Sequence, residues 1–290
     1  MGANLRVVTL NFWGTEPPLD RRLDLAIRQL RDLAPDVVCL QEVRPLDGKS
    51  GTTTAHTIGA ALGLAVHYAV ACEWDDHPKL APGQEGLAIL AKSIVATRTQ
   101  SLPEARPADS RLLLSAQVAT DAEPVWVHTT HLHYRLDDGV AREKQVLAID
   151  AAIRDLRTDT SPPQILCGDM NATPDSDEMR FLRGLTTLSN RRTHFQDAWL
   201  RLHREPGPTD GPAQGITWSS ENRFTRPLRS LDIDRRIDYI YVTSRKKDGR
   251  GTIHAARVVL AERDGDGEDA ICASDHYGVL ADVQVVPSLA

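Results

Sequence analysis

Residues 167–176, CGDMNATPDS, place two oxygen-bearing side chains where a strand-like apolar run ends in a turn. Asp169 and Asn171 are two positions apart, so on extended backbone both side chains face the same way. The pair is a candidate reaction site. The alternative is that Asp and Asn serve as ordinary turn residues ahead of a helix that starts near Pro174.

Three further polar groups lie near the C-terminus in segments that otherwise resemble core strands. Asp238 interrupts the apolar run RRIDYIYV, where a buried carboxylate is costly without a partner. Asp275 and His276 open the last strand-like segment, ASDHYGVLADV. None of these groups gains from burial in an apolar core, so they indicate a site.

Polar side chains also end three apolar runs in the first half of the chain: Asn11, Glu42 and His131. Each has a plain alternative explanation. Asn11 reads alternatively as a turn former, Glu42 as a cap or ion-pair partner, and one of His131 and His133 as a core histidine while the other faces a site. If the C-terminal strands run opposite to the others, all of these groups meet at one edge.

Carboxylates that meet at close range repel one another unless a cation lies between them. Oxygen ligands favour a hard divalent ion, Mg²⁺ or Mn²⁺, which often joins carboxylates to a substrate phosphate. The predicted chemistry is therefore metal-assisted hydrolysis of a phosphoester. The sequence contains no HExxH, GxSxG or GxxxxGK[ST] motif, and no GxGxxG follows the first strand-like run.

The chain twice reads strand, helix, strand, which is the unit that brings strand ends together. The first unit comprises residues 5–11, 19–34 and 37–43, and the second comprises residues 125–131, 139–157 and 164–169. Apolar residues recur at helical spacing in residues 19–34. A connection of this length favours parallel neighbouring strands with a right-handed crossover.

Further strands are predicted at residues 86–94, 110–119, 237–243, 254–262 and 277–286. Two mixed, largely antiparallel sheets, packed face to face with helices outside, would use all of these elements. Residues 1–290 show no linker or break in composition and are predicted to form one domain. Long loops are expected at residues 72–85, 201–215 and 219–235, where substrate would be selected.

Composition indicates an ordinary globular protein, with 41% hydrophobic and 26% charged residues. No apolar run approaches the roughly 20 residues that span a bilayer, and the N-terminus shows no cleavage pattern, so we expect a cytoplasmic protein without stable membrane association. The four cysteines form no CxxC pair, which argues against structural zinc. The net charge of -6 argues against a bulk nucleic-acid coat, yet residues 222–236 carry five arginines, in either a solvated loop or a phosphate-contacting rim.

Seven motifs in this order resemble the endonuclease/exonuclease/phosphatase superfamily, which includes deoxyribonuclease I, sphingomyelinases, deadenylases and tyrosyl-DNA phosphodiesterases. They are TLNFWG, CLQEV, GLAIL, TTHLH, CGDMNATPDS, RRIDYIYV and ASDHYGVLADV, from residue 9 to about 283. GDMN, RIDY and SDH are specific only in combination. TTHLH differs from the AP endonuclease pattern and favours the sphingomyelinase, deadenylase and tyrosyl-DNA phosphodiesterase side. The resemblance implies a four-layer α/β/β/α sandwich with the site at one end.

The resemblance also implies a role for each candidate. Glu42 would be the principal Mg²⁺ ligand, supported by Asn11 and Asp275. Asp169 would orient and deprotonate the attacking water, and Asn171 would hold water or a phosphate oxygen.

On the phosphate side, His276 would bind the scissile phosphate and stabilise its developing charge. Asp238 would pair with His276 and fix its tautomer, while His131 would contact the phosphate or assist the leaving group.

Three residues are candidates for substrate binding. Trp218 and Asn222 could supply a stacking face and an amide for a base or sugar, and Arg111 could contact phosphate. Core packing of Trp218 and a surface ion pair of Arg111 are the alternatives.

The leading hypothesis is an Mg²⁺-dependent phosphodiesterase that acts on nucleic acid or a nucleotide-containing ester. A phosphatase or a sphingomyelinase-like phospholipid phosphodiesterase is the enzymatic alternative. A binding module that kept the fold without catalysis is the non-enzymatic one, and the complete set of acidic residues and His276 argues against it.

Overall fold

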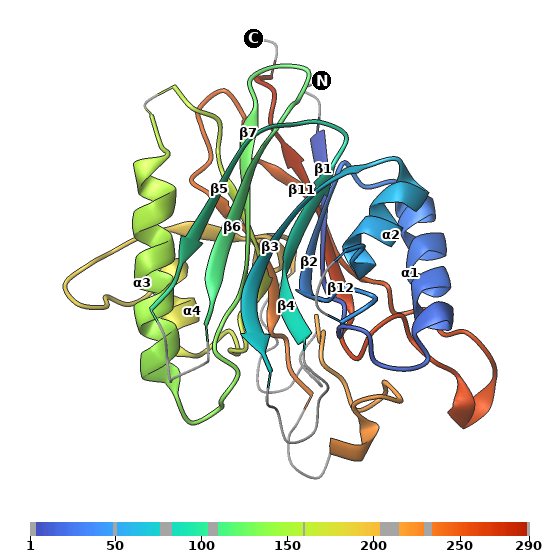
Figure 1. The fold of residues 1–290 in the computed structure, drawn as a ribbon. Helices are drawn as coiled ribbons and strands as arrows, with labels where there is room; N and C mark the ends of the chain where they lie inside the picture. Colours follow the sequence, from blue (N-terminus) through green and yellow to red (C-terminus); the bar gives the residue numbers. More distant parts are fainter. Residues whose placement is uncertain are drawn as a thin grey trace.

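The computed structural model describes residues 4–48, 51–75, 83–103, 110–158, 160–203, 215–228 and 234–288. Within them, two six-stranded sheets pack face to face (Figure 1). The first sheet contains, in order across it, β11 (Ile253–Val259), β12 (Gly278–Gln284), β1 (Asn4–Asn11), β2 (Val37–Val43), β4 (Gly83–Ala91) and β3 (Ala65–Trp74). The second contains β5 (Ile94–Ser101), β6 (Leu112–Val118), β7 (Val125–His131), β8 (Ile165–Asp169), β10 (Asp238–Thr243) and β9 (Phe195–Asp197).

Helices cover the outer face of each sheet. The first sheet is covered by α1 (Leu19–Leu33) and α2 (Thr54–Leu62), and the second by α3 (Gly139–Asp155) and α4 (Asp177–Leu182) (Figure 1). A short α5 (Ala198–Leu202) follows β9, and 3-10 turns occur at Arg226–Leu228 and Gly267–Asp269. No helix in these described ranges is both long and apolar enough to cross a membrane.

Apolar side chains from both sheets form the core between them. Val7 and Val37 of the first sheet belong to the same buried cluster as Val127 and Ile240 of the second. Separate clusters join α1 and α2 to the first sheet, and α3 and α4 to the second. The predicted four-layer sandwich is therefore confirmed.

Strand directions bring the polar strand ends to one edge. β1 runs parallel to β2, with Asn11 opposite Gln41, and β7 runs parallel to β8, with His131 opposite Asp169. β12 and β10 run antiparallel to these pairs, so they begin where the others end. This shared edge is the lower end of the molecule in Figure 1, away from the two chain termini.

The strand predicted at residues 86–94 is confirmed for residues 86–91, but its predicted end is wrong. β4 ends at Ala91 in the first sheet, and β5 begins at Ile94 in the second. The chain crosses between sheets at Lys92 and Ser93, both exposed. The loop predicted at residues 72–85 is shorter than expected, because β3 continues to Trp74 and β4 starts at Gly83, while residues 76–82 lie outside the described ranges.

A buried histidine on β7 contributes to the cohesion of the second sheet. His128 is fully buried, its Nδ1 lies 2.7 Å from Ser115 Oγ, and its Nε2 lies 2.8 Å from Gln164 Oε1. The Gln164 amide donates to Ile153 O, which turns its oxygen toward the ring. Burial lowers the pKa of His128 to about 4, although the bond to Gln164 acts in the opposite direction.

Stability should therefore fall as the pH falls from about 6.5 to about 4. In the unfolded chain His128 is protonated below about pH 6.5, whereas in the native protein it stays neutral until the pH falls to about 4. The full shift corresponds to about 3 kcal/mol of unfolding free energy. Urea unfolding at several pH values should show this slope in the wild type and a flatter one in His128→Gln. Equal slopes in the two proteins would contradict the assignment.

Candidate active site

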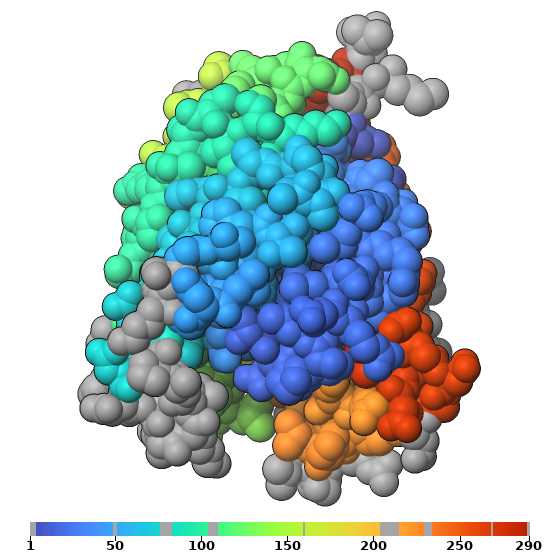
Figure 2. All heavy atoms as spheres, turned by 45° about the vertical axis from the view of Figure 1, so that its right-hand side comes forward, coloured from blue at the N-terminus to red at the C-terminus, as the bar shows by residue number. Residues whose placement is uncertain are grey.

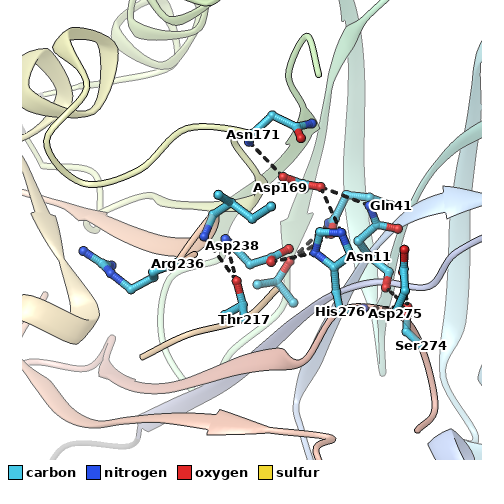
Figure 3. A network of polar contacts seen from close by, with 12 residues as sticks. Asn11, Gln41, Asp169, Asn171, Thr217, Arg236, Asp238, Ser274, Asp275 and His276 are labelled. Atoms are coloured by element: carbon cyan, nitrogen blue, oxygen red, sulfur yellow. Dashed lines mark hydrogen bonds and ion pairs between the residues drawn. The ribbon is translucent and has the colours of Figure 1, made fainter. Parts of the chain in front are cut away.

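Most of the predicted site residues meet at the shared edge of the two sheets (Figure 3). They are Asn11, Glu42, His131, Asp169, Asn171, Asp238, Asp275 and His276. Asn11 and Glu42 come from β1 and β2, and Asp275 and His276 immediately precede β12, so these four belong to the first sheet. The remaining residues lie at the ends of β7, β8 and β10 in the second sheet. The site is thus divided between the two sheets.

Asn11 joins the two halves. Its side-chain NH₂ donates to Glu42 Oε1 at 2.9 Å and to Asp169 Oδ2 at 3.0 Å. Its Oδ1 accepts the backbone N–H of Trp13 at 3.1 Å, which orients the amide with its donors toward the carboxylates. In this orientation Asn11 acts as a hydrogen-bond donor, and its role as a metal ligand stays a prediction.

Asp238 and His276 form the pair expected from the sequence. Asp238 Oδ2 lies 2.9 Å from His276 Nδ1, and both residues are buried. Burial by itself lowers the pKa of His276, but Asp238, Asp275 and Asp169 together raise it well above its ordinary value. The ring is therefore an imidazolium, and its Nε2, 3.8 Å from Asp169 Oδ2, carries a proton that it can donate.

Asp169 has the surroundings of a base that works near neutral pH. It is buried, and burial together with Asp238 raises the pKa of Asp169 to about 6. His276 and the donors Asn11 and Asn171 limit this rise. A carboxylate with such a pKa is ionised at pH 7 yet basic enough to accept a proton from water.

Asn171 reaches Asp169 through its backbone and not through its side chain. Its N–H donates to Asp169 Oδ1 at 2.8 Å (Figure 3). Its φ of 49° is left-handed, so the extended backbone assumed from the sequence is wrong here. The side-chain amide instead donates to Leu132 O at 3.0 Å. Contact between this amide and water or phosphate stays a prediction.

His131 faces the site, whereas His133 does not. His131 Nε2 lies 3.5 Å from Asp169 Oδ2, and burial, Arg111 and His276 hold the pKa of His131 well below its ordinary value. His131 is therefore neutral. His133 follows the end of β7, and its Nε2 lies 3.5 Å from Asp138, the N-cap residue of α3.

The sequence profile of the Endonuclease/Exonuclease/phosphatase family matches residues 8–276. The chain belongs to this family. Its members are hydrolases that act on phosphoesters and are generally dependent on divalent metals. No curated protein sequence matches the chain.

Solved structures share the fold. D. rerio TDP2 complexed with single strand DNA product has a TM-score of 0.69 at 20% identity, over 97% of this chain and 98% of that chain. The human Nocturnin catalytic domain with bound sulfate anion has a TM-score of 0.67 at 18% identity, over 98% and 94%. An endonuclease/exonuclease/phosphatase from Beutenbergia cavernae DSM 12333 has a TM-score of 0.69 at 24% identity, over 98% and 72%. The predicted family and fold are confirmed.

The metal dependence typical of the family agrees with the charges at Glu42. Burial, Glu85 and Asp275 raise the pKa of Glu42 to about 8, so its charge lacks the compensation that a cation would supply. The ligand atoms of Asp169, Asp238 and His276 also lie within 4.8 Å of one another. In that second group Asp238 Oδ2 is already engaged by His276 Nδ1 at 2.9 Å. Glu42 and Asp275 are therefore the better fit for a divalent ion.

The three predicted substrate-binding residues occupy different environments. Asn222 is fully buried, and its amide donates to the carbonyl oxygens of Ser274 and Asp275 at 2.8 and 3.0 Å. Trp218 is only 8% exposed, with the Arg235 guanidinium 5.0 Å from its ring centre. Asn222 thus binds the backbone just before His276, and Trp218 forms an isolated β-bridge with His276. Contact of either side chain with substrate stays a prediction.

Arg111 lies closer to the reaction centre. It lines a small cavity together with His131 and lies 6.0 Å from the Tyr134 ring. This position is compatible with its predicted contact to phosphate.

Of the arginines at residues 222–236, Arg229 lies outside the described ranges, and Arg236 is buried in an ion pair with Asp197.

Sequence reasoning missed an aromatic pair beside the site. The rings of Trp13 and Phe224 lie 4.8 Å apart, where the N-terminal segment adjoins the 216–228 segment at the lower edge of Figure 2. Arg22, fully buried on α1, lies 4.9 Å from the Trp13 ring and donates to Ala273 O at 3.1 Å. Nothing in the sequence distinguishes this buried arginine from an arginine that is exposed on the surface of a helix.

Thr217 and Ser274 are two further supports that sequence reasoning missed. Thr217 Oγ1 accepts the N–H groups of Ile237 and Asp238, both at 3.2 Å (Figure 3). Ser274 Oγ donates to Asn11 O at 2.6 Å. These hydroxyls hold the ends of β10 and β1 against the His276 turn.

Proposed function

We propose that this protein is a divalent-metal-dependent phosphodiesterase that acts on nucleic acid or on a nucleotide-containing ester, with Mg²⁺ as the ion and Mn²⁺ as a substitute. One observation carries the proposal. A carboxylate base with a pKa of about 6, Asp169, lies 3.8 Å from a protonated His276 that Asp238 holds in place. A base that accepts a proton from water and a neighbouring cationic donor to the phosphate oxygens are two groups that hydrolysis of a phosphoester by water can use.

Each residue has one task in the proposed reaction. Glu42 and Asp275 would hold the ion, which when bound compensates charge on the phosphoryl oxygens. Asp169 orients a water molecule and accepts its proton as the new oxygen–phosphorus bond forms. The bond from phosphorus to the leaving ester oxygen breaks in the same step, and the departing oxygen takes up a proton from solvent. His276 donates from Nε2 to a phosphate oxygen and stabilises the charge that develops there.

The aromatic pair supports a nucleotide-containing substrate. Trp13 and Phe224 are both half-buried, and Trp13 follows Asn11 by two residues. Aromatic side chains beside a phosphate site are suited to stacking on a base. The single-stranded DNA product described for D. rerio TDP2 adds support from a protein of the same fold.

Divalent ions should be required for turnover. We expect EDTA to abolish hydrolysis and Mg²⁺ or Mn²⁺ to restore it. Glu42→Gln should raise the Mg²⁺ concentration for half-maximal activity by at least about tenfold, because it removes a charged ligand. Glu123→Gln, an exposed glutamate near Arg250, is the matched control. Full activity in EDTA would contradict the proposal.

A substrate panel tests the reaction class and separates the alternatives. The purified protein should be assayed against DNA, RNA, 5′-tyrosyl-DNA, sphingomyelin and simple phosphomonoesters. Release of nucleotides supports the proposal. Release of phosphocholine or of inorganic phosphate alone would favour a phospholipid phosphodiesterase or a phosphatase. Failure to turn over any phosphoester would reject enzymatic function.

A further inference from the structure

A buried polar layer lies directly beneath the site. Gln41 Nε2 donates to Thr129 Oγ1 at 2.8 Å and to Thr9 Oγ1 at 3.1 Å, and all three residues are fully buried. Thr9 and Gln41 belong to β1 and β2 of the first sheet, whereas Thr129 belongs to β7 of the second. The layer therefore links the two sheets.

Strand periodicity places this layer one step below the reacting groups. Thr9 precedes Asn11 by two residues on β1, and Thr129 precedes His131 by two residues on β7, so the members of each pair share a face. Gln41 is the neighbour of Asn11 across β1 and β2, and Figure 3 shows the two side by side. The Gln41 layer is thus the floor of the site.

Below this floor the contact between the sheets becomes apolar. Val7, Cys39, Val127 and Cys167 continue the same faces and belong to the core cluster between the sheets. Apolar packing is not directional, so it leaves the relative sliding of two sheets less restricted than hydrogen bonds do. Replacing both partners of a satisfied buried hydrogen bond by apolar groups of the same shape is often nearly neutral for stability. Stability alone therefore does not account for a polar layer at this level.

We propose that Gln41, with Thr9 and Thr129, is a positioning residue that sets the register of the two sheets at the catalytic edge. The bond from Asn11 to Asp169 and the bond from His276 to Asp238 both connect a first-sheet group to a second-sheet group. Both depend on how the sheets lie relative to each other. The inference rests on the proposed function, because the reaction is what this register serves. A displacement of about 1 Å at such groups can cost about 100-fold in rate.

Thr129 offers a matched pair of variants. Thr129→Ser keeps the hydroxyl that Gln41 reaches, whereas Thr129→Val keeps the shape and removes the hydroxyl. We expect Thr129→Val and Gln41→Leu to lower kcat by about 10- to 100-fold with little change in KM. Thr129→Ser should stay close to the wild type. Melting temperatures should separate this loss from unfolding.

A control comes from a buried polar contact elsewhere in the same sheet. Ser115→Ala removes the hydroxyl that contacts His128, away from the site. It should lower the melting temperature and leave kcat unchanged. An equal loss of kcat in Ser115→Ala and Thr129→Val, or in Thr129→Ser and Thr129→Val, would overturn the positioning role.

Crystal structures of the two Thr129 variants provide a readout that is independent of activity. The separation between Asn11 Nδ2 and Asp169 Oδ2, 3.0 Å in the wild type, should lengthen in Thr129→Val and stay the same in Thr129→Ser. An unchanged separation in Thr129→Val would overturn the inference. If the wild type hydrolyses no phosphoester, the proposed function fails, and this comparison still decides whether the polar layer sets the register.

Discussion

Replacing Asp169 by Asn is expected to lower kcat by about 1,000-fold, because an amide of the same shape cannot accept the proton of the attacking water. Asp169 is the only carboxylate in the described site that combines a pKa of about 6 with direct bonds from both Asn11 and Asn171. The measurement is kcat at saturating substrate and Mg²⁺, together with thermal unfolding to show that the fold persists.

Asp175→Asn is the matched control for this prediction. Asp175 lies in the same CGDMNATPDS run, is exposed, and contacts Thr173 Oγ1. Its replacement makes the same chemical change six residues away and should leave kcat near the wild-type value. Near-normal turnover in Asp169→Asn would show that another group activates the water.

The second large effect is expected at the Asp238 and His276 pair. His276→Ala removes the donor to the phosphate, and Asp238→Asn removes the charge that keeps the ring protonated and oriented. Each should lower kcat by about 1,000- to 10,000-fold. Because the two side chains act as one unit, the double variant should be little worse than either single variant.

Asp282→Asn serves as the control for the pair. Asp282 lies on β12, the strand that follows His276, but it pairs with Arg6 away from the site. Its replacement should leave kcat unchanged. Fully additive losses in the double variant, or an active Asp238→Asn protein, would mean that the 2.9 Å contact between Asp238 and His276 has no catalytic role.

Local patterns predicted the two strand, helix, strand units because each unit buries one face at a regular spacing. Leu23, Ala26 and Leu30 are spaced as one face of a helix, and all three are buried against the first sheet. Periodicity gave the wrong end for the strand predicted at residues 86–94, because β4 ends at Ala91 and Ile94 begins β5 in the other sheet. It also missed α2 and β3, and β3 is a partly exposed edge strand without clear alternation.

The sequence by itself indicated most of the charged groups that meet at the shared edge, because a carboxylate such as Asp169 or Asp238 stays buried in a strand only where a partner offsets its desolvation. It also indicated that their strands end at a common edge. Only the tertiary structure decided how those groups are used. The left-handed backbone of Asn171, the orientation of the Asn11 amide and the burial of Asn222 all depend on neighbours distant in sequence. Hydrogen bonds are directional, and their directions follow from how the two sheets pack.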